Sequence, residues 1–265
     1  MEQLIARAAR DLVDSKYAVG LTGAGISTES GIRDFRGPQG VWTLNPEAER
    51  RAYSGYQMFL EDPKGWWEER LAGTGLGFLG NLEEAMPNAG HYTLVELEKM
   101  GILKCVITQN VDALHEKAGT KNLLEYHGSS AKLRCVSCNL RFRRDEFDLD
   151  KLMQEDQLPP HCPKCGGIVK SDSVAFGEPI PSDVAQQSLE EAWKCDLMLI
   201  CGTSAVVYPF ASLPRIARER GAATIIEVNA EPTPLTEEGI SDYLISGKTG
   251  EILPRILEEV KKLRK

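Results

Sequence analysis

Four of the seven cysteines in the sequence form two pairs, and two residues separate the members of each pair. Cys135 and Cys138 make the first pair, and Cys162 and Cys165 make the second, with residues 139–161 between them. Two such knuckles are typical of a tetrahedral zinc site, because four thiolates fill the coordination sphere of the ion. Since no position is left for water, the sequence predicts one structural Zn²⁺ per chain and not a catalytic metal.

His127, in the stretch EYHG, lies a few residues before the first cysteine pair. Four cysteines already complete the metal site, so neither His127 nor His161 is needed as a ligand. An imidazole can accept a proton near neutral pH, which makes His127 a candidate general base; a packing residue is the alternative interpretation. The sequence carries no Ser-His-Asp or Cys-His pattern, which argues against a hydrolase with a side-chain nucleophile. His115 is expected to be structural.

The stretch TGAGISTESGIRDFRG could bind a nucleotide. Gly23 and Gly25 follow an apolar run, where glycines allow the close backbone approach that a pyrophosphate needs, at the N-terminus of the next helix. Thr28 occupies the sixth position of the G-x-G-x-x-G pattern, so a tight turn without a ligand is the alternative. Asp34 and Arg36 follow in a glycine-flanked loop, where charged residues are frequently functional; a solvated loop is the alternative there.

Polar residues also follow three later apolar runs. Gln109 and Asn110 end the first, the GTS segment at 202–204 ends the second, and Asn229 ends the third. The carboxyl ends of parallel strands are where α/β folds bind ligands, so these positions could hold ribose or phosphate oxygens. They could also merely cap the following helices, and for Asp112 capping is a strong alternative.

Apolar runs of the chain predict the elements that position these polar residues. The runs cover residues 17–25, 103–112, 197–204, 224–232 and 242–247, and they alternate with amphipathic, helix-like segments. Runs of this length that are rich in valine and isoleucine suit a parallel sheet buried on both faces. The alternation therefore predicts an α/β fold with right-handed crossovers.

Two stretches interrupt this alternation. Residues 37–87 contain no clear strand, and residues 129–169 contain both cysteine pairs. We interpret them as a helical insertion and a zinc-binding insertion, which together form a smaller lobe. The rest of the chain, residues 1–36, 88–128 and 170–265, would make a Rossmann-like lobe with a parallel sheet. A cleft between two lobes is a common ligand site.

The composition limits the classes of partner. The 265 residues include 39 acidic and 31 basic side chains, a net charge of −8, which argues against direct binding to nucleic acid. No stretch approaches the roughly 20 apolar residues of a membrane span, and the N-terminal segment lacks the apolar run of a signal peptide. We therefore expect a cytoplasmic protein that contacts no membrane. Cys105, Cys195 and Cys201 should be core thiols.

Taken together, these motifs resemble the sirtuins, the NAD-dependent protein deacylases. The matching segments occur in the family's order and are GAGISTESGIRDFRG, TQNVDALHEKAG, YHG, the two C-x-x-C pairs, FGE at 176–178, GTSAVVYP and VNAE. Each segment alone is unspecific, but the joint match is highly specific. The resemblance implies a Rossmann-type lobe, a small lobe of helical and zinc-binding insertions, and an acylated lysine in an extended protein segment clamped between them.

The resemblance also implies roles for individual residues. Those that would contact NAD are Gly23, Ala24, Gly25, Ile26, Asp34, Phe35, Arg36, Trp42, Gln109, Asn110, Val111, Asp112, Gly202, Thr203, Ser204, Asn229, Ala230, Glu231 and Thr249. Those that would bind the acylated peptide are Val174, Phe176, Gly177, Val207 and Tyr208, where the segments SVAFGE and VVYP resemble the family's peptide-pairing strands. His127 and Asn110 would be catalytic.

In the mechanism that the family implies, nicotinamide leaves as the acyl oxygen attacks the ribose, and His127 then acts as general base for a ribose hydroxyl. The products would be free lysine, nicotinamide and O-acyl-ADP-ribose. Arg33, Ser171 and Ala175 depart from the family pattern, and the Tyr-x-x-Arg pair of the succinyl-lysine readers is absent, so we expect a neutral acyl group, mainly acetyl. The alternatives are a protein mono-ADP-ribosyltransferase that uses the same NAD site and a non-enzymatic NAD-binding scaffold.

Overall fold

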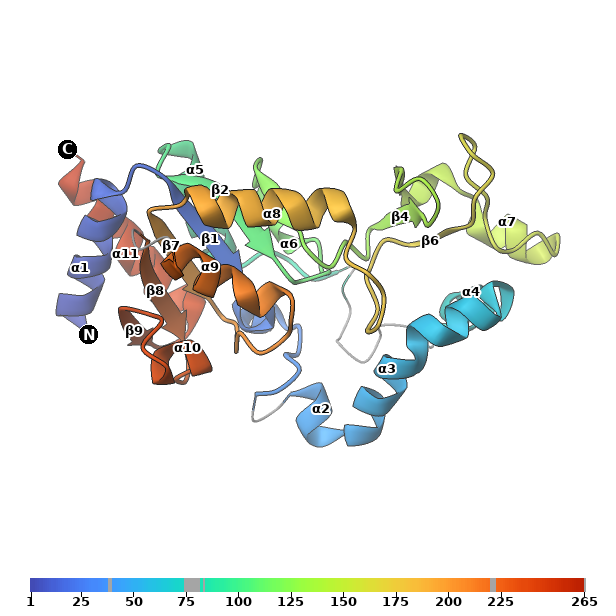
Figure 1. The fold of residues 1–265 in the computed structure, drawn as a ribbon, viewed down its shortest axis with the longest axis horizontal. Coiled ribbons are helices and arrows are strands. Elements are labelled where there is room, and N and C mark those ends of the chain that lie inside the picture. Colours follow the sequence, from blue (N-terminus) through green and yellow to red (C-terminus); the bar gives the residue numbers. More distant parts are fainter. Residues whose placement is uncertain (38–39, 74–81, 83, 220–222, 265) are drawn as a thin grey trace.

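The computed structural model describes residues 1–37, 40–73, 82, 84–219 and 223–264. Within these residues, the main element is a six-stranded sheet with the strand order β3-β2-β1-β7-β8-β9, in which every adjacent pair is parallel (Figure 1). The strands are β1 (Ala18–Thr22), β2 (Leu103–Thr108), β3 (Leu123–Glu125), β7 (Leu197–Cys201), β8 (Thr224–Asn229) and β9 (Tyr243–Ser246). β1 and β7 are buried along their whole length, so the predicted parallel α/β sheet is confirmed.

Helices cover both faces of this sheet. On one face, α11 (Thr249–Leu263) packs against both α1 (Glu2–Asp14) and α5 (Ala89–Lys99). On the other face, α8 (Ser182–Lys194) packs against α9 (Leu213–Glu219). α1 illustrates why these segments are helical, because Ile5, Ala8 and Leu12 recur at helical spacing and are all buried in the core. No helix in the described part of the chain is both long and apolar enough to cross a membrane.

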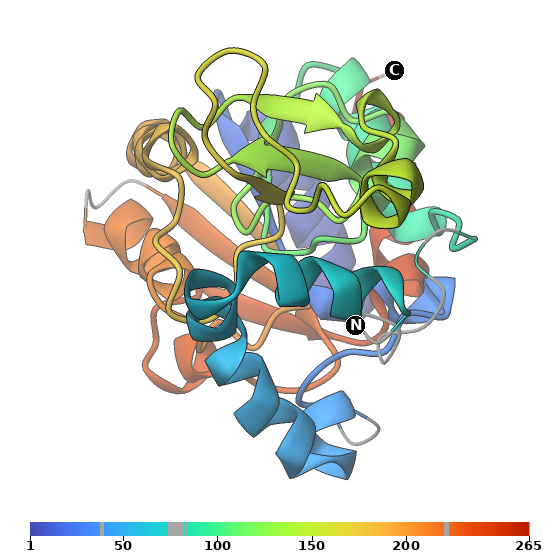
Figure 2. The same ribbon diagram turned by 90° about the vertical axis from the view of Figure 1, so that its right-hand side faces the viewer.

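A second, three-stranded antiparallel sheet has the order β5-β4-β6 and lies at one end of the molecule (Figures 1 and 2). Its strands are β4 (Lys132–Cys135), β5 (Arg141–Arg143) and β6 (Val169–Ser171), and α7 (Leu149–Gln154) follows β5. The helices α2 (Val41–Leu44), α3 (Pro46–Glu61) and α4 (Pro63–Leu71) come from the other interruption of the α/β alternation. The indole of Trp67 in α4 donates a hydrogen bond to the Val169 carbonyl at 3.0 Å and joins the core of the small sheet.

The packing of Trp67 therefore brings the two predicted insertions together. The lobe boundaries themselves remain the prediction made from the sequence.

The structure adds to the sequence analysis, or differs from it, in several local details. The strand β3 was not expected, because three half-buried residues are too short for a periodic signal. The element after Gly23 is the 3₁₀ helix η1 (Ala24–Ser30) and not an α-helix. The segments SVAFGE and VVYP are loops in this structure, and their pairing with an extended peptide remains a prediction. Asp112 is not the N-cap of α6 (Leu114–Ala118), since Ala113 holds that position with a φ of 61°.

Two histidines, His91 and His115, are buried beneath the sheet's carboxyl edge with their ring centroids 4.8 Å apart. Nε2 of His115 lies 2.9 Å from Oγ1 of Thr22, and the backbone N–H of Asn88 donates to Nδ1 of His91. Burial lowers the pKa of His91 to about 4, and burial followed by the charge of His91 lowers the pKa of His115 well below its usual value. Both rings are therefore neutral structural groups at pH 7, as expected for His115.

We expect the free energy of unfolding to decrease as the pH falls from 7 to 5. Below pH ~6.5 the unfolded chain protonates these histidines, whereas the folded chain resists protonation until the lowered pKa values are reached. With a folded pKa of about 4, His91 alone contributes a loss of about 2 kcal/mol at pH 5. Urea unfolding at both pH values measures the effect. His91→Gln should reduce the pH dependence, and His161→Gln, at an exposed site, should not; equal slopes in the two variants would contradict this assignment.

Candidate active site

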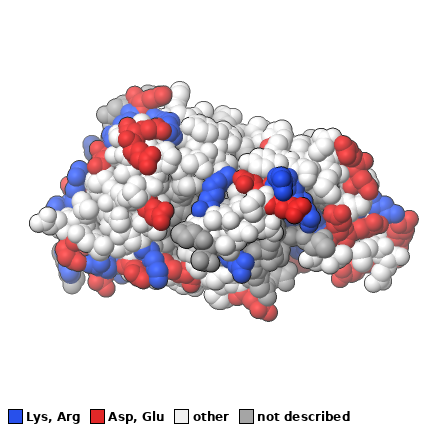
Figure 3. All heavy atoms as spheres, turned by 90° about the horizontal axis from the view of Figure 1, so that it is seen from below, with Lys and Arg blue, Asp and Glu red and all other residues white. Residues whose placement is uncertain are grey.

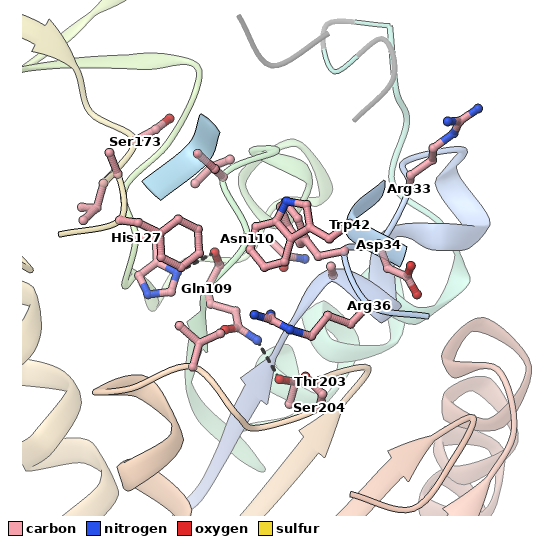
Figure 4. A pocket seen from close by; sticks show the side chains of 18 of the residues that line it. Arg33, Asp34, Arg36, Trp42, Gln109, Asn110, His127, Ser173, Thr203 and Ser204 are labelled. Carbon is pink, nitrogen blue, oxygen red and sulfur yellow. Dashed lines mark hydrogen bonds between the residues drawn. The ribbon is translucent and has the colours of Figure 1, made fainter. Parts of the chain in front are cut away.

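A cavity of about 1210 Å³ lies at the carboxyl ends of β1, β2, β7 and β8 and extends to α3 and α4 (Figure 4). Loops from the main sheet supply most of its polar wall, and the helical segment supplies Trp42, Met58 and Trp66. The carboxyl edge of a parallel sheet is the expected ligand site of an α/β fold, because strand ends from distant parts of the chain converge there. On the face shown in Figure 3, acidic and basic side chains are mixed over most of the surface, and acidic ones gather at the right-hand end.

Glycines allow the loops after β1 and β7 to approach closely at the floor of the cavity. The N–H of Gly25 donates to the Gly202 carbonyl at 2.7 Å. A Cβ atom on Gly25 would lie 2.8 Å from Cα of Gly202, and one on Gly202 would lie 2.3 Å from N of Ile26. The φ of Gly202 is +61°, a conformation that also favours glycine. Only glycine therefore fits at both positions, and the two loops are held in direct backbone contact.

Two sets of hydrogen bonds between polar residues continue this floor after the end of β2. The Gln109 amide donates to Oγ1 of Thr203 at 2.6 Å. The Asn110 amide donates to the Gly23 carbonyl at 3.0 Å and to Oγ of Ser27 at 3.2 Å.

The hydrogen bonds of Asn110 continue through Ser27 to the buried carboxylate of Asp112. Asp112 accepts a 2.6 Å hydrogen bond from the hydroxyl of Ser27 and a 2.9 Å hydrogen bond from the N–H of Leu114. Its side chain thus satisfies the first N–H of α6 from the position before the N-cap residue Ala113. Burial raises the pKa of Asp112, and these two bonds oppose that effect. The network holds Asn110 and Gln109 in fixed orientations at the cavity wall.

His127 faces the same cavity from the loop after β3 (Figure 4). Nδ1 of His127 lies 3.2 Å from the Gln109 carbonyl oxygen, which can only accept a hydrogen bond. Nδ1 therefore carries the proton, and Nε2 has a free lone pair. Burial lowers the pKa of His127, and the bond to Gln109 opposes the shift. The ring is thus neutral near pH 7 and able to accept a proton at Nε2, as a general base must.

An aromatic wall lies across the cavity from the polar floor. Phe35 and Trp42 have ring centroids 4.8 Å apart, Trp42 and Phe176 are 5.4 Å apart, and Phe176 and Tyr53 are 4.5 Å apart. The guanidinium of Arg36 lies 4.4 Å from the Trp42 ring. The sequence analysis missed Met58, Trp66 and Arg70 of the cavity lining, and also Tyr53, which contacts Phe176 but is not in that lining. The reason is that α3 and α4 carry no motif that marks the side facing the cavity.

The cavity brings together most of the residues singled out in the sequence. Its lining includes Ala24, Gly25, Asp34, Phe35, Arg36, Trp42, Gln109, Asn110, Val111, Asp112, His127, Val174, Phe176, Gly177, Gly202, Thr203, Ser204, Val207, Tyr208, Asn229, Ala230 and Glu231. Three predicted cofactor residues, Gly23, Ile26 and Thr249, are not in this lining. Ile26 is buried in the core and Thr249 is buried at the start of α11. The contacts of these three residues with NAD therefore stay predictions from the resemblance.

The four predicted cysteine ligands form one cluster apart from this cavity. The Sγ atoms of Cys135, Cys138, Cys162 and Cys165 all lie within 4.8 Å of one another, with two of the separations at 3.5 and 3.8 Å. Zn–S bonds of about 2.3 Å in a tetrahedron require S···S distances of about 3.8 Å, so the cluster fits a zinc ion. His161 is not part of it, and its Nδ1 lies 3.0 Å from the Gly166 carbonyl.

The remaining cysteines are ordinary core residues. Cys105, Cys195 and Cys201 are buried free thiols, and burial raises the pKa of Cys105 and of Cys195 to about 12. Such thiols are protonated and unreactive at neutral pH, as predicted from their place in apolar runs.

Comparisons with known proteins agree with this geometry. The model of the Sir2 family matches residues 23–209. A protein of Archaeoglobus fulgidus named NAD-dependent protein deacylase 2 is 46% identical over 265 residues, which cover 100% of this chain and 99% of that protein. A solved complex of a Sir2 homologue with NAD is 39% identical, with a TM-score of 0.77 and coverage of 100% and 95% of the two chains. A Sir2 enzyme bound to a myristoylated histone peptide is 40% identical, with a TM-score of 0.69 and coverage of 100% and 99%.

These matches extend over nearly the whole chain and agree with the motifs quoted from the sequence. The family model alone covers more than half of the residues. The resemblance to the sirtuins is thereby confirmed, and the chain belongs to the Sir2 family.

Proposed function

We propose that this chain is an NAD-dependent protein lysine deacylase that transfers an acyl group, chiefly acetyl, from lysine to ADP-ribose and releases nicotinamide. The observation that carries the proposal is the neutral His127, whose Nε2 is free to accept a proton in a cavity that lacks a metal cluster among its described residues. Among the described residues no serine, threonine or cysteine side chain is hydrogen-bonded to the His127 ring. Such a base suits a reaction in which a hydroxyl of the co-substrate is the nucleophile.

The relatives support this assignment. The Archaeoglobus fulgidus protein is named a deacylase, and the solved homologues hold NAD in one case and an acylated histone peptide in another. All seven cysteines are free thiols, which suits the reducing cytoplasm, where we propose that the enzyme acts. The cysteine cluster would hold zinc as a structural ion, because four thiolates leave no open position.

Different residues of the cavity would bind different parts of NAD. The closely packed loops at Gly25 and Gly202, with Thr203 and Ser204, would receive the phosphates and riboses of NAD. Gln109 and Asn110, held by their own hydrogen bonds, would orient the nicotinamide ribose. NAD, when bound, supplies the ADP-ribose that accepts the acyl group.

On the side of the peptide, His127 would take the proton of a ribose hydroxyl at Nε2. Val174 and Phe176 would enclose the acylated lysine, and the loops that carry them and Tyr208 would bind the extended peptide. The aromatic wall of Phe35, Trp42 and Phe176 would exclude water from the reacting atoms.

Purified protein, NAD and an acetyl-lysine peptide provide the direct test. A deacylase should release deacetylated peptide, nicotinamide and O-acetyl-ADP-ribose in equal amounts, which mass spectrometry can measure. Transfer of ADP-ribose to protein, without loss of the acetyl group, would instead identify a mono-ADP-ribosyltransferase. If no NAD is consumed, the chain is a binding scaffold and the proposal is wrong.

We expect Asn229→Ala to weaken NAD use much more than peptide use. Asn229 ends β8 at the cavity, and its amide donates to the Glu231 carbonyl at 2.9 Å, which shapes the loop proposed to bind a ribose. Losing such a contact should raise the KM for NAD on the order of ten-fold. Steady-state kinetics with each substrate varied in turn measures the two KM values. A rise confined to the KM for peptide would place the cofactor elsewhere in the cavity.

A further inference from the structure

Two buried carboxylates mark the ends of the loop that carries Val174 and Phe176. Asp172 and Glu178 have side chains that are only 1% and 4% exposed. We call residues 172–178 the acyl segment, because its middle residues line the cavity beside His127 (Figure 4). The segment has neither helix nor strand structure, so side-chain contacts must define its shape.

Arg134 binds both ends of the acyl segment at once. Its Nε donates to Oδ1 of Asp172 at 3.0 Å, and its Nη2 donates to Oε1 of Glu178 at 2.6 Å. The Arg134 side chain is 5% exposed, so both ion pairs are shielded from water, where charge-assisted hydrogen bonds are strong. One planar guanidinium therefore sets the distance between the two ends of the loop.

Other cations surround the same carboxylates. Nζ of Lys170 lies 3.0 Å from Oε2 of Glu178 and donates to the carbonyls of Ser171 and Ser173 at 2.7 and 2.8 Å. Arg141 lies 3.4 Å from Asp172 and also pairs with Asp183. The buried charges are thus balanced, and removing one partner leaves another uncompensated.

The acyl segment is also tied to the candidate base. The N–H of Val174 donates to the His127 carbonyl at 2.8 Å, and the N–H of Ser129 donates to Oδ2 of Asp172 at 3.2 Å. Gly128 lies so close that a Cβ atom there would be 2.0 Å from the Asp172 carbonyl oxygen. A displacement of Asp172 would therefore move the acyl segment relative to the backbone on both sides of His127.

A third hydrogen bond connects Arg134 with the cysteine cluster. Its Nη1 donates to Oδ1 of Asn139 at 3.1 Å, and Asn139 directly follows Cys138. Arg134 itself directly precedes Cys135 in β4. The Arg134 guanidinium thus connects the first cysteine pair with both ends of the acyl segment.

We propose that Arg134 is a positioning residue that sets the width of the acyl-lysine site and so limits the acyl groups that the enzyme accepts. It acts through Asp172 and Glu178 and does not itself line the cavity. The proposal rests on the proposed deacylase function. Lysine cannot replace this arginine, because one ammonium group lacks the rigid fork that reaches two carboxylates and an amide oxygen together.

The test compares Arg134→Lys with the matched control Arg143→Lys, which alters an exposed arginine on the neighbouring strand β5. One peptide is used in acetyl-lysine and octanoyl-lysine forms, and each is assayed with NAD varied and with peptide varied. In Arg134→Lys, the KM for acetyl peptide should rise on the order of ten-fold, while the KM for NAD barely changes. The preference for octanoyl over acetyl peptide should increase, because a loosened segment admits a larger group. Arg143→Lys should match the wild type in all three quantities.

Glu178→Gln provides a second variant if Arg134→Lys folds poorly, since it weakens one end of the same contact and should shift the KM and the acyl preference in the same direction. Zinc content and the melting temperature are measured for every variant. Unchanged acyl preference and peptide KM in both variants would overturn the proposal. So would a parallel loss of NAD use, peptide use and zinc, which would make Arg134 a purely structural residue of the small sheet. A wild-type chain that releases no acyl-ADP-ribose would instead reject the deacylase assignment itself, and the positioning role with it.

Discussion

Replacing His127 with alanine is expected to reduce overall deacylation by about 10² to 10⁴-fold, the usual contribution of a general base. The structure supplies the physical reason, since the Gln109 carbonyl keeps the proton on Nδ1 and burial keeps the ring neutral, which leaves Nε2 as the proton acceptor. In the proposed reaction the base acts after nicotinamide has left. Exchange of labelled nicotinamide into NAD, measured with acylated peptide present, should therefore survive better than full turnover.

The control measurements separate a base from a packing residue. Zinc content should not change in His127→Ala, because four cysteines already complete the metal cluster. The melting temperature should change little, and His161→Ala, at the exposed histidine next to Cys162, should retain full activity. In the wild type, the acidic limb of kcat/KM should lie below pH ~6.5, since burial lowers the pKa of His127 and activity is lost only when the ring becomes protonated. Equal loss of exchange and turnover in a destabilised variant would reject the base assignment.

Removing the metal should have an effect of similar size through a different route. In Cys135→Ser, or after treatment with a strong chelator, we expect the small antiparallel sheet to unfold and activity to disappear. Cys135 is fully buried in the core that contains Trp67 and Leu133. Loss of the metal from the cysteine cluster should therefore also disrupt the packing of this core. Zinc binding to such four-ligand sites contributes about 10–16 kcal/mol of apparent binding free energy, which exceeds the net folding free energy expected of a small sheet.

Metal analysis and tryptophan fluorescence measure this result. The wild type should contain about one zinc per chain. Emission from Trp66 and Trp67 should shift to longer wavelength when the core opens to water. Cys195→Ser, which alters a thiol outside the cluster, should keep its zinc. Far less zinc in the wild type would contradict the assignment, as would activity that varies with metal identity while the fold stays intact.

The features that could be predicted from the sequence are those encoded by residues close together in the chain. Each cysteine knuckle requires two cysteines three positions apart, and the apolar runs that became β1 and β7 are continuous. Thus the zinc cluster and the parallel sheet could be predicted without coordinates. The roles carried over to Gly23, Ile26 and Thr249 stay predictions, because these residues are not in the cavity lining and position in a motif does not tell which residues reach the cavity.

The features that could not be predicted depend on contacts between distant segments or on small changes of backbone angle. Nothing in the spacing of Arg134 and Glu178 indicates that one guanidinium joins two ends of a loop. The positive φ of Ala113 displaces the cap of α6 by one residue, so Asp112 reaches Leu114 from outside the helix. Tyr53 meets Phe176 only because α3 folds back over the cavity.

The order of strands in the main sheet also has a kinetic consequence. β1 lies between β2 and β7, so the central strand of the core cannot be fully paired until β7 has been made, long after both cysteine knuckles. Contacts within the small sheet span shorter stretches of the chain, since β4 pairs with β5 a few residues away and with β6 just after the second cysteine pair. Because non-local parallel pairing is slow and local pairing is fast, the nascent chain should capture its metal before its core closes. During that interval the unpaired edge of β1 would be exposed to pairing with other strands and to aggregation. The yield of folded protein should therefore depend on the rate of synthesis.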